Sequence, residues 1–65
     1  MNAEETLIYI IGLFTYYLDE LNEFERNDFI HGETTAYVET LEIIQMWKFA
    51  KLHGLDYEIE NKYKI

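Results

Sequence analysis

One group of polar side chains in this 65-residue sequence is of the type that binds metal ions. Asp28, His31 and Glu33 lie close together, and carboxylates and imidazoles are ligands for zinc and for hard cations. Di-metal helical bundles use a Glu-x-x-His pair, but the residue three before His31 is Asp28, and the residue three before His53 is Ala50. We therefore expect a solvated polar turn and no metal cofactor, with a metal-dependent module as the weakest alternative.

Other kinds of catalysis have few candidate residues. The sequence contains no serine and no cysteine, so the commonest nucleophiles of acyl transfer are missing. Gly12, Gly32 and Gly54 are isolated, so there is no glycine-rich loop to bind phosphate. Carboxylate pairs such as Asp19 and Glu23 occur by chance in any acidic protein. We expect a non-enzymatic protein with no catalytic residue and no cofactor.

The charge balance limits the partners of the chain. A net charge of −8 repels phosphates and anionic membranes, so we expect neither nucleic acid nor membrane as a direct partner. A dense acidic run has two interpretations. The favoured one is a solvated face that keeps the protein soluble. The alternative is a nucleic-acid mimic that inhibits a basic nucleic-acid-binding protein. The run consists of Asp19, Glu20, Glu23, Glu25 and Asp28.

The length and composition predict a single domain (residues 1–65) that associates with a copy of itself. A domain of this size buries only about 60% of the surface of its unfolded chain. The absence of cysteine excludes disulfides as a staple, and an apolar fraction of 49% is more than a small interior can hide. The apolar stretch at 7–18 is shorter than the roughly 20 residues that span a bilayer. We expect a cytoplasmic protein.

The first half of the chain predicts an amphipathic helix over residues 3–24. Asn2 is a good N-cap, and Glu5 lies at the spacing of a capping box. Apolar side chains then recur every three or four residues and define the face that should be buried. These side chains are Leu7, Ile10, Ile11, Phe14, Leu18 and Leu21.

A second helix is predicted over residues 34–53, after a connection at 25–33. Asn27, Asp28 and Gly32 favour turns, and Gly54 suits the end of the second helix. A short connection makes the two helices antiparallel. The second helix has two apolar faces, of which the first helix can cover only one. We predict that the other face pairs two hairpins into a four-helix bundle, with an interface made by Ala36, Ile43, Met46, Trp47 and Ala50.

The C-terminal tail alternates apolar and charged residues. Leu55, Tyr57 and Ile59 are separated by single acidic residues, and the alternation resumes over residues 62–65. This period of two predicts a short extended segment, with a strand, a hairpin at Glu60-Asn61 and an irregular docked tail all left open. The predicted fold is therefore a mostly α antiparallel hairpin with a short extended tail.

Three stretches carry a resemblance to a known group of proteins. HGETTAYVE at 31–39, LEIIQ at 41–45 and the junction Gly54-Leu55-Asp56 resemble small acidic proteins of Gram-positive phages and mobile elements. Such proteins have no catalytic residues to transfer. The resemblance implies an accessory role. Together with the residues, it leads us to expect a small acidic protein that acts by protein–protein interaction.

Overall fold

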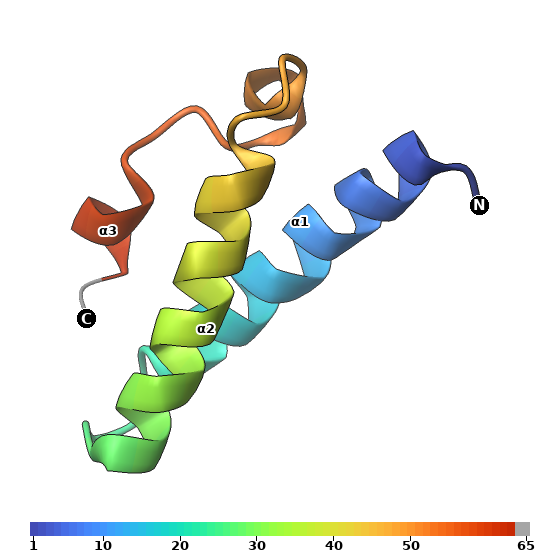
Figure 1. Cartoon of the computed structure of the whole chain (residues 1–65). Coiled ribbons are helices and arrows are strands. Elements are labelled where there is room, and N and C mark those ends of the chain that lie inside the picture. The colour runs from blue at the N-terminus through green and yellow to red at the C-terminus, as the bar shows by residue number, and fades with distance from the viewer. Residues whose placement is uncertain (64–65) are drawn as a thin grey trace.

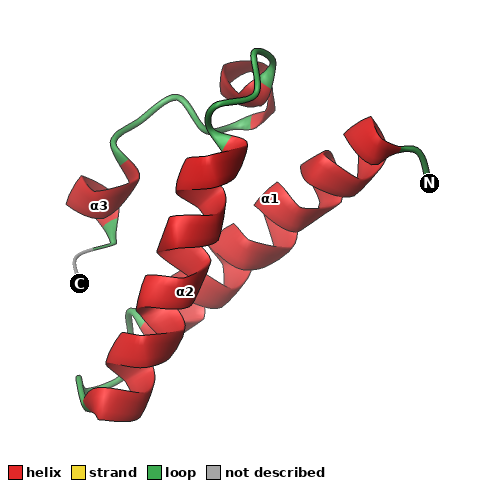
Figure 2. Ribbon diagram, viewed as in Figure 1, coloured by secondary structure: helices red, strands yellow, loops and turns green. Residues whose placement is uncertain are grey.

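The computed structural model describes residues 1–63, and this part of the chain is mostly helical (Figure 1). The elements are α1 (Ala3–Leu21), α2 (Asp28–Ile44), the 3-10 helix η1 (Ala50–His53) and α3 (Ile59–Lys62). No strand occurs among residues 1–63 (Figure 2). The two long helices run in opposite directions and diverge toward the N-terminus of α1 (Figure 1). The prediction of a mostly α chain with two long helices is confirmed.

Helix α1 begins as its sequence predicts. The Glu5 backbone N–H donates to Asn2 Oδ1 at 2.8 Å, and the Asn2 N–H donates to Glu5 Oε1 at 3.4 Å, which completes the capping box. The predicted apolar stripe faces inward, because Ile11 and Leu18 are buried and their stripe neighbours pack around them. The helix ends at Leu21, a little before the predicted end at residue 24.

Helix α2 begins six residues earlier than predicted, at Asp28. Asn27 is its N-cap, and Asn27 Oδ1 accepts a hydrogen bond from the Ile30 N–H at 2.8 Å. Asparagine and aspartate favour both turns and helix N-caps. The sequence pattern at Asn27-Asp28 predicts a turn, whereas in the structure Asn27 is an N-cap. Gly32 lies within the helix, and its space is open enough for a side chain.

We predict that Asn27→Ala lowers the free energy of unfolding by about 1 kcal/mol, because one amide at the start of α2 loses its acceptor. Asn27→Asp is the matched control: it keeps an acceptor and adds a charge that suits the helix N-terminus. Urea unfolding followed by circular dichroism measures both. Equal losses in the two variants would contradict the assignment of Asn27 as the cap.

The prediction that the second helix continues to residue 53 is wrong. After Ile44 the backbone changes to hydrogen bonds between residues three apart, such as Trp47 N–H to Ile44 O at 2.9 Å and Ala50 N–H to Trp47 O at 3.0 Å. Residues 45–49 form turns that lead into η1, so the segment no longer follows the helical period of 3.6 residues. Ile44 and Ala50 are buried, and Trp47 packs on the core between them.

This irregular segment ends at Gly54, as the sequence predicts, although Gly54 follows η1 and not the long helix. Its φ of 105° is a conformation that glycine adopts without steric cost. The Leu55 N–H donates back to Ala50 O at 3.1 Å. The side chain of Gln45 donates to Leu55 O at 3.1 Å and to Tyr57 O at 2.8 Å, so it fastens the tail to the end of α2.

Of the three alternatives for the tail, the strand and the hairpin do not occur within residues 55–63, and the tail is instead docked, with irregular backbone before a short helix. Leu55, Ile59 and Tyr63 are at most 2% exposed, so the tail buries every fourth residue and contains the short helix α3. Tyr57, which a strand would place beside Leu55 and Ile59, is only half-buried. The alternation predicted at Lys64 and Ile65 lies outside the described residues. The tail is therefore part of the core, against α2.

One long-range hydrogen bond ties this tail to α1. The hydroxyl of Tyr63 donates to Asp19 Oδ1 at 2.9 Å. Burial and this hydrogen bond raise the pKa of Tyr63 well above its usual value. The bond therefore ties the C-terminal end of α3 to Asp19, the first residue of the acidic run.

Candidate functional site

The structure separates the five residues of the predicted self-interface. Ile43 and Met46 are 69% and 85% exposed, and Ala36 is also exposed on α2. Ala50 is completely buried, so it belongs to the core and cannot form an interface. Trp47 is half-buried. The correction follows from the end of α2 at residue 44, because a continuous helix would have put all five on one face.

Trp47 is held by its own neighbours. Its ring stacks on His53 with centroids 5.5 Å apart and planes 4° apart, and it meets Phe49 edge-on at 5.8 Å. Such aromatic pairs add to the stabilisation that comes from burial alone. Trp47 therefore stabilises the segment 45–53, and its substitution would disturb folding as well as any interface.

A different apolar surface is exposed here. We name it the Met46 patch, and it comprises Ile43, Met46, Phe49 and Leu52. These four residues are spaced three apart in the sequence, and the core-facing residues Ile44, Trp47 and Ala50 lie between them. The amino group of Lys48 lies 4.9 Å from the centre of the Phe49 ring and borders the patch. The predicted interface included Ile43 and Met46, whereas Leu52 was not predicted to take part in binding.

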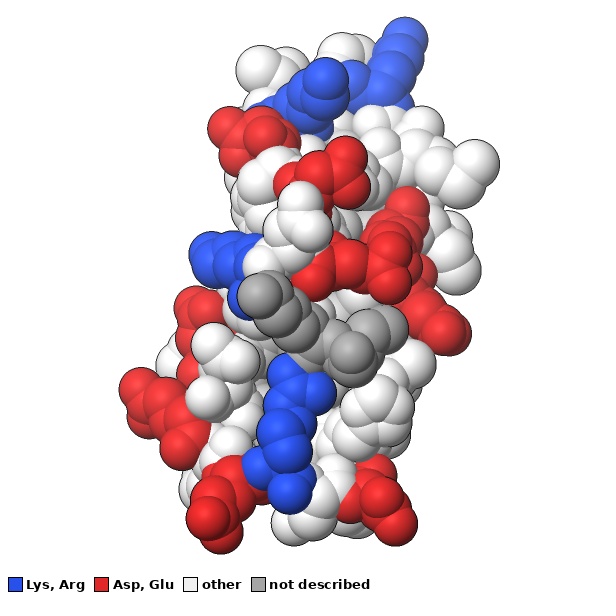
Figure 3. Space-filling view, turned by 90° about the vertical axis from the view of Figure 1, so that its left-hand side faces the viewer, with Lys and Arg blue, Asp and Glu red and all other residues white. Residues whose placement is uncertain are grey.

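The acidic run is exposed along its whole length, yet parts of it have structural roles. Asp19 accepts the hydrogen bond from Tyr63. Glu20 interacts with Tyr16, and this hydrogen bond raises the pKa of Tyr16. Figure 3 shows acidic side chains dispersed over one face, with basic side chains between them. On this face, acidic side chains do not form one continuous field.

The possible metal ligands do not form a site. Asp28, His31 and Glu33 all lie in the first part of α2. Within residues 1–63, no three histidine, aspartate or glutamate side chains are grouped so that they could hold an ion. The alternative of a metal-dependent module therefore loses the ligand set on which it depended.

Carboxylates also meet where α3 packs on α2. Partial burial and the nearby Glu60 raise the pKa of Glu42, with smaller effects from Glu39 and Glu58. Burial disfavours the charged form of the Glu42 carboxyl most, and repulsion from the neighbouring carboxylates adds to this effect. No nucleophile or imidazole accompanies them in the set of groups that affects Glu42. We assign no catalytic role to this cluster.

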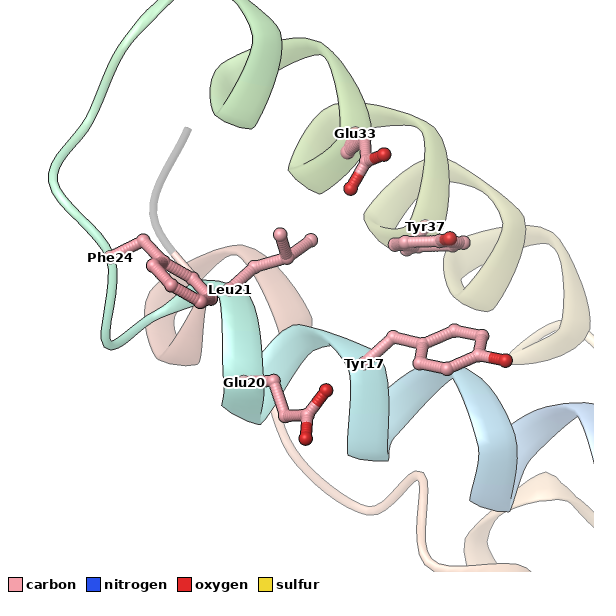
Figure 4. Close-up of a pocket in the computed structure, with 6 residues that line it drawn as sticks. All are labelled: Tyr17, Glu20, Leu21, Phe24, Glu33 and Tyr37. Atoms are coloured by element: carbon pink, nitrogen blue, oxygen red, sulfur yellow. The ribbon is translucent and has the colours of Figure 1, made fainter.

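An open pocket, which the sequence pattern does not predict, lies between α1 and α2 (Figure 4). Its volume is about 240 Å³. We name it the tyrosine pocket. It is lined by Tyr17, Glu20, Leu21, Phe24, Glu33 and Tyr37.

The aromatic rings of this pocket form a connected cluster. Tyr17 and Tyr37, one from each helix, have centroids 5.5 Å apart. The ring of Phe14 has its centre 4.7 Å from that of Tyr37, and both residues pack against the core. Phe24 lies in the connection that follows α1 and is 63% exposed. The rings are therefore fixed on their inner side and accessible from solvent.

Comparison of the chain with family models, with curated proteins and with solved structures gives no match. Across residues 1–63, none of the helices combines the length and the apolar character needed to cross a bilayer.

Proposed function

We propose that this chain is a non-enzymatic protein that acts by association, and that the Met46 patch is where two copies meet. The single observation that carries the proposal is the exposure of this patch. Four large apolar side chains in one segment, among them Met46 at 85% and Leu52 at 78% exposed, are costly to leave in water. Large exposed apolar patches mark binding sites, and the grouping of these four residues within ten positions of the chain favours one such patch.

The shape of the chain supports a second copy as the occupant. The Cα atoms extend over 35 × 23 × 15 Å, so the molecule is elongated and its shortest extent is that of two helix layers, since two packed helices span about 13–15 Å between their Cα atoms. The radius of gyration is 11.9 Å, against about 10.7 Å for a compact chain of this length. The accessible surface is 4722 Å², against roughly 4,400 Å² for a compact monomer of this mass. The radius of gyration and the surface area both exceed the compact values, as expected of a chain that leaves apolar surface for a copy to cover.

Two further features bear on the biological role. The resemblance to small acidic proteins of phages and mobile elements favours an accessory role. The net charge of −8 favours basic partners, as the mimic alternative requires. Mimicry is the weaker proposal, because Asp19 and Glu20 already interact within the chain.

The experiment is sedimentation equilibrium over a wide concentration range. We expect the wild-type chain to form dimers and Met46→Asp to raise the dissociation constant at least tenfold, because the interface would have to bury an unpaired charge. Phe29→Asp is the matched control. Phe29 is 70% exposed and lies about 21 Å along α2 from Ile43, so its substitution should leave the dissociation constant unchanged.

Two results would contradict the proposal. One is a wild-type chain that stays monomeric at several hundred micromolar. The other is a Met46→Asp variant that associates as the wild type does. The salt dependence separates the two functions, because an apolar interface persists at high ionic strength whereas binding by charge mimicry weakens steeply.

A further inference from the structure

We infer that the tyrosine pocket binds an arginine side chain of a basic partner protein. The inference does not depend on self-association through the Met46 patch. It rests on three properties of the pocket: the faces of its rings, the carboxylates at its sides and its size.

The rings provide a surface on which a cation can stack. Tyr17 and Tyr37 come from different helices, and their planes are inclined by 38°. Figure 4 shows both rings at the gap between the helices, with Phe24 at its other end. The negative face of an aromatic ring attracts a cation, and a planar guanidinium stacks on such a face better than a compact ammonium does.

The carboxylates provide the charge. Glu20 on α1 and Glu33 on α2 flank the pocket from its two sides (Figure 4). None of the six described residues that line the pocket is basic, so its lining carries negative charge only. An arginine that stacks on Tyr37 can direct its N–H groups to Glu33. Hydrogen bonds between charged groups are about twice as strong as neutral ones.

The size of the pocket selects a side chain and not a whole metabolite. Sites for small molecules typically have volumes of about 300–1,000 Å³, and this pocket has about 240 Å³ and is open to solvent. A single long side chain inserted from a protein surface fits such a space. The net charge of −8 would attract a basic surface and raise the rate of encounter.

The test uses Nα-acetyl-arginine methylamide, in which the guanidinium is the only charge. Titration into the 15N-labelled full chain at low salt should give saturable shifts of the amides of Tyr17, Glu33 and Tyr37. We expect a dissociation constant on the order of 1–10 mM, as befits one side chain. Nα-acetyl-citrulline methylamide has nearly the same shape without the charge and should not saturate.

Variants connect the binding to the residues. Glu33→Gln should weaken binding at least about threefold, since it removes the charge and keeps the shape. Tyr37→Phe keeps the ring face and should bind as the wild type does, which separates stacking from any effect of the hydroxyl. Met46→Asp should also leave binding unchanged, so that failure of the proposed dimer and failure of this site give different results.

Three outcomes would overturn the inference. The first is equal binding of the arginine and citrulline compounds. The second is equal binding of Nα-acetyl-lysine methylamide, which would mean that charge alone is recognised. The third is a set of shifts spread over all carboxylate-bearing segments, with Glu58 affected as much as Glu33.

Discussion

Leu55→Ala should remove a large part of the stability of this protein, whereas Leu52→Ala, three residues earlier, should leave it nearly unchanged. Leu55 is completely buried and Leu52 is 78% exposed. The two substitutions remove the same atoms from the same region of the chain. The comparison therefore isolates burial from every other property of leucine.

The expected size of the loss follows from core substitutions in other proteins. Truncation of a buried leucine to alanine costs about 2–5 kcal/mol, because burial is lost and a cavity remains. A chain of this length has a total free energy of unfolding of about 3–10 kcal/mol, at 0.05–0.15 kcal/mol per residue. The Leu55 variant should thus be marginally folded or unfolded at room temperature.

Urea unfolding followed by circular dichroism measures both variants, with the fluorescence of Trp47 as a second probe. The chain has one tryptophan, and it packs against the same core as Leu55. If both variants unfolded at the wild-type urea concentration, the tail would not be part of the core. Leu52 belongs to the Met46 patch, so the measurement is made at low concentration, where association contributes little.

The sequence predicted α1 best, because its signals are local. The cap at Asn2 and the apolar stripe through Ile11 and Leu18 require only the helical period. No other element has to be known to interpret them. The predicted end at residue 24 exceeded the observed end at Leu21 by three residues.

The ends of α2 were predicted less well, because their signals have two meanings. Asn27 and Asp28 favour a turn as much as a helix start. At the other end no proline or glycine marks the stop at Ile44, and apolar residues continue beyond it. The observed end is held by tertiary bonds, since Gln45 donates to two carbonyl groups of the tail. Such bonds cannot be predicted from a local pattern.

The tail shows how two periods can coexist. Leu55, Tyr57 and Ile59 satisfy a period of two, while Leu55, Ile59 and Tyr63 satisfy a spacing of four. For a short segment, periodicity does not decide between strand and helix. A lone strand would need a partner strand, which residues 1–63 do not offer, whereas a short helix can pack directly on α2.

The candidate binding surfaces were harder to predict from the sequence than the helices, because they depend on how the elements pack together. The exposure of the Met46 patch depends on the end of α2 at Ile44, where turns replace the α-helix. The tyrosine pocket exists because Tyr17 and Tyr37 meet across two helices, and the sequence does not give the relative rotation of the helices. Aromatic residues with glutamates three or four positions away, such as Glu33 with Tyr37, were the available signal.

The second large effect concerns the hydroxyl of Tyr63, and it should reverse sign with pH. At pH 7 the hydrogen bond to Asp19 stabilises the folded chain. Tyr63→Phe keeps the buried ring and removes this bond, so it should lower the free energy of unfolding by about 1 kcal/mol. Asp19 is exposed, so its carboxylate is hydrated again in the variant.

Above pH 10 the same hydroxyl makes the free energy of unfolding decrease as the pH rises. Burial raises the pKa of Tyr63 in the folded chain above the usual value of about 10, which it regains on unfolding. The folded chain thus holds a proton that the unfolded chain has lost. The resulting stability is fully present below pH 10 and is lost as the pH rises from 10 toward the folded pKa. The loss from this group is about 1.4 kcal/mol per pH unit.

The phenylalanine variant has no proton to lose at this position, so its stability should lack this slope. At pH 10 the free energy of unfolding of the wild type should exceed that of Tyr63→Phe by about 1 kcal/mol, and above pH 10 it should fall by about 1.4 kcal/mol per pH unit. The two proteins should therefore be equally stable at about pH 11. Urea midpoints of both proteins at pH 7, 10 and 11.5 test whether their order of stability reverses.

Tyr9→Phe is the matched control, since Tyr9 is 58% exposed and its hydroxyl reaches water in both states. A constant difference between Tyr63→Phe and wild type at all three pH values would mean that the Tyr63 hydroxyl is not enclosed against Asp19, and that α3 is not docked as described.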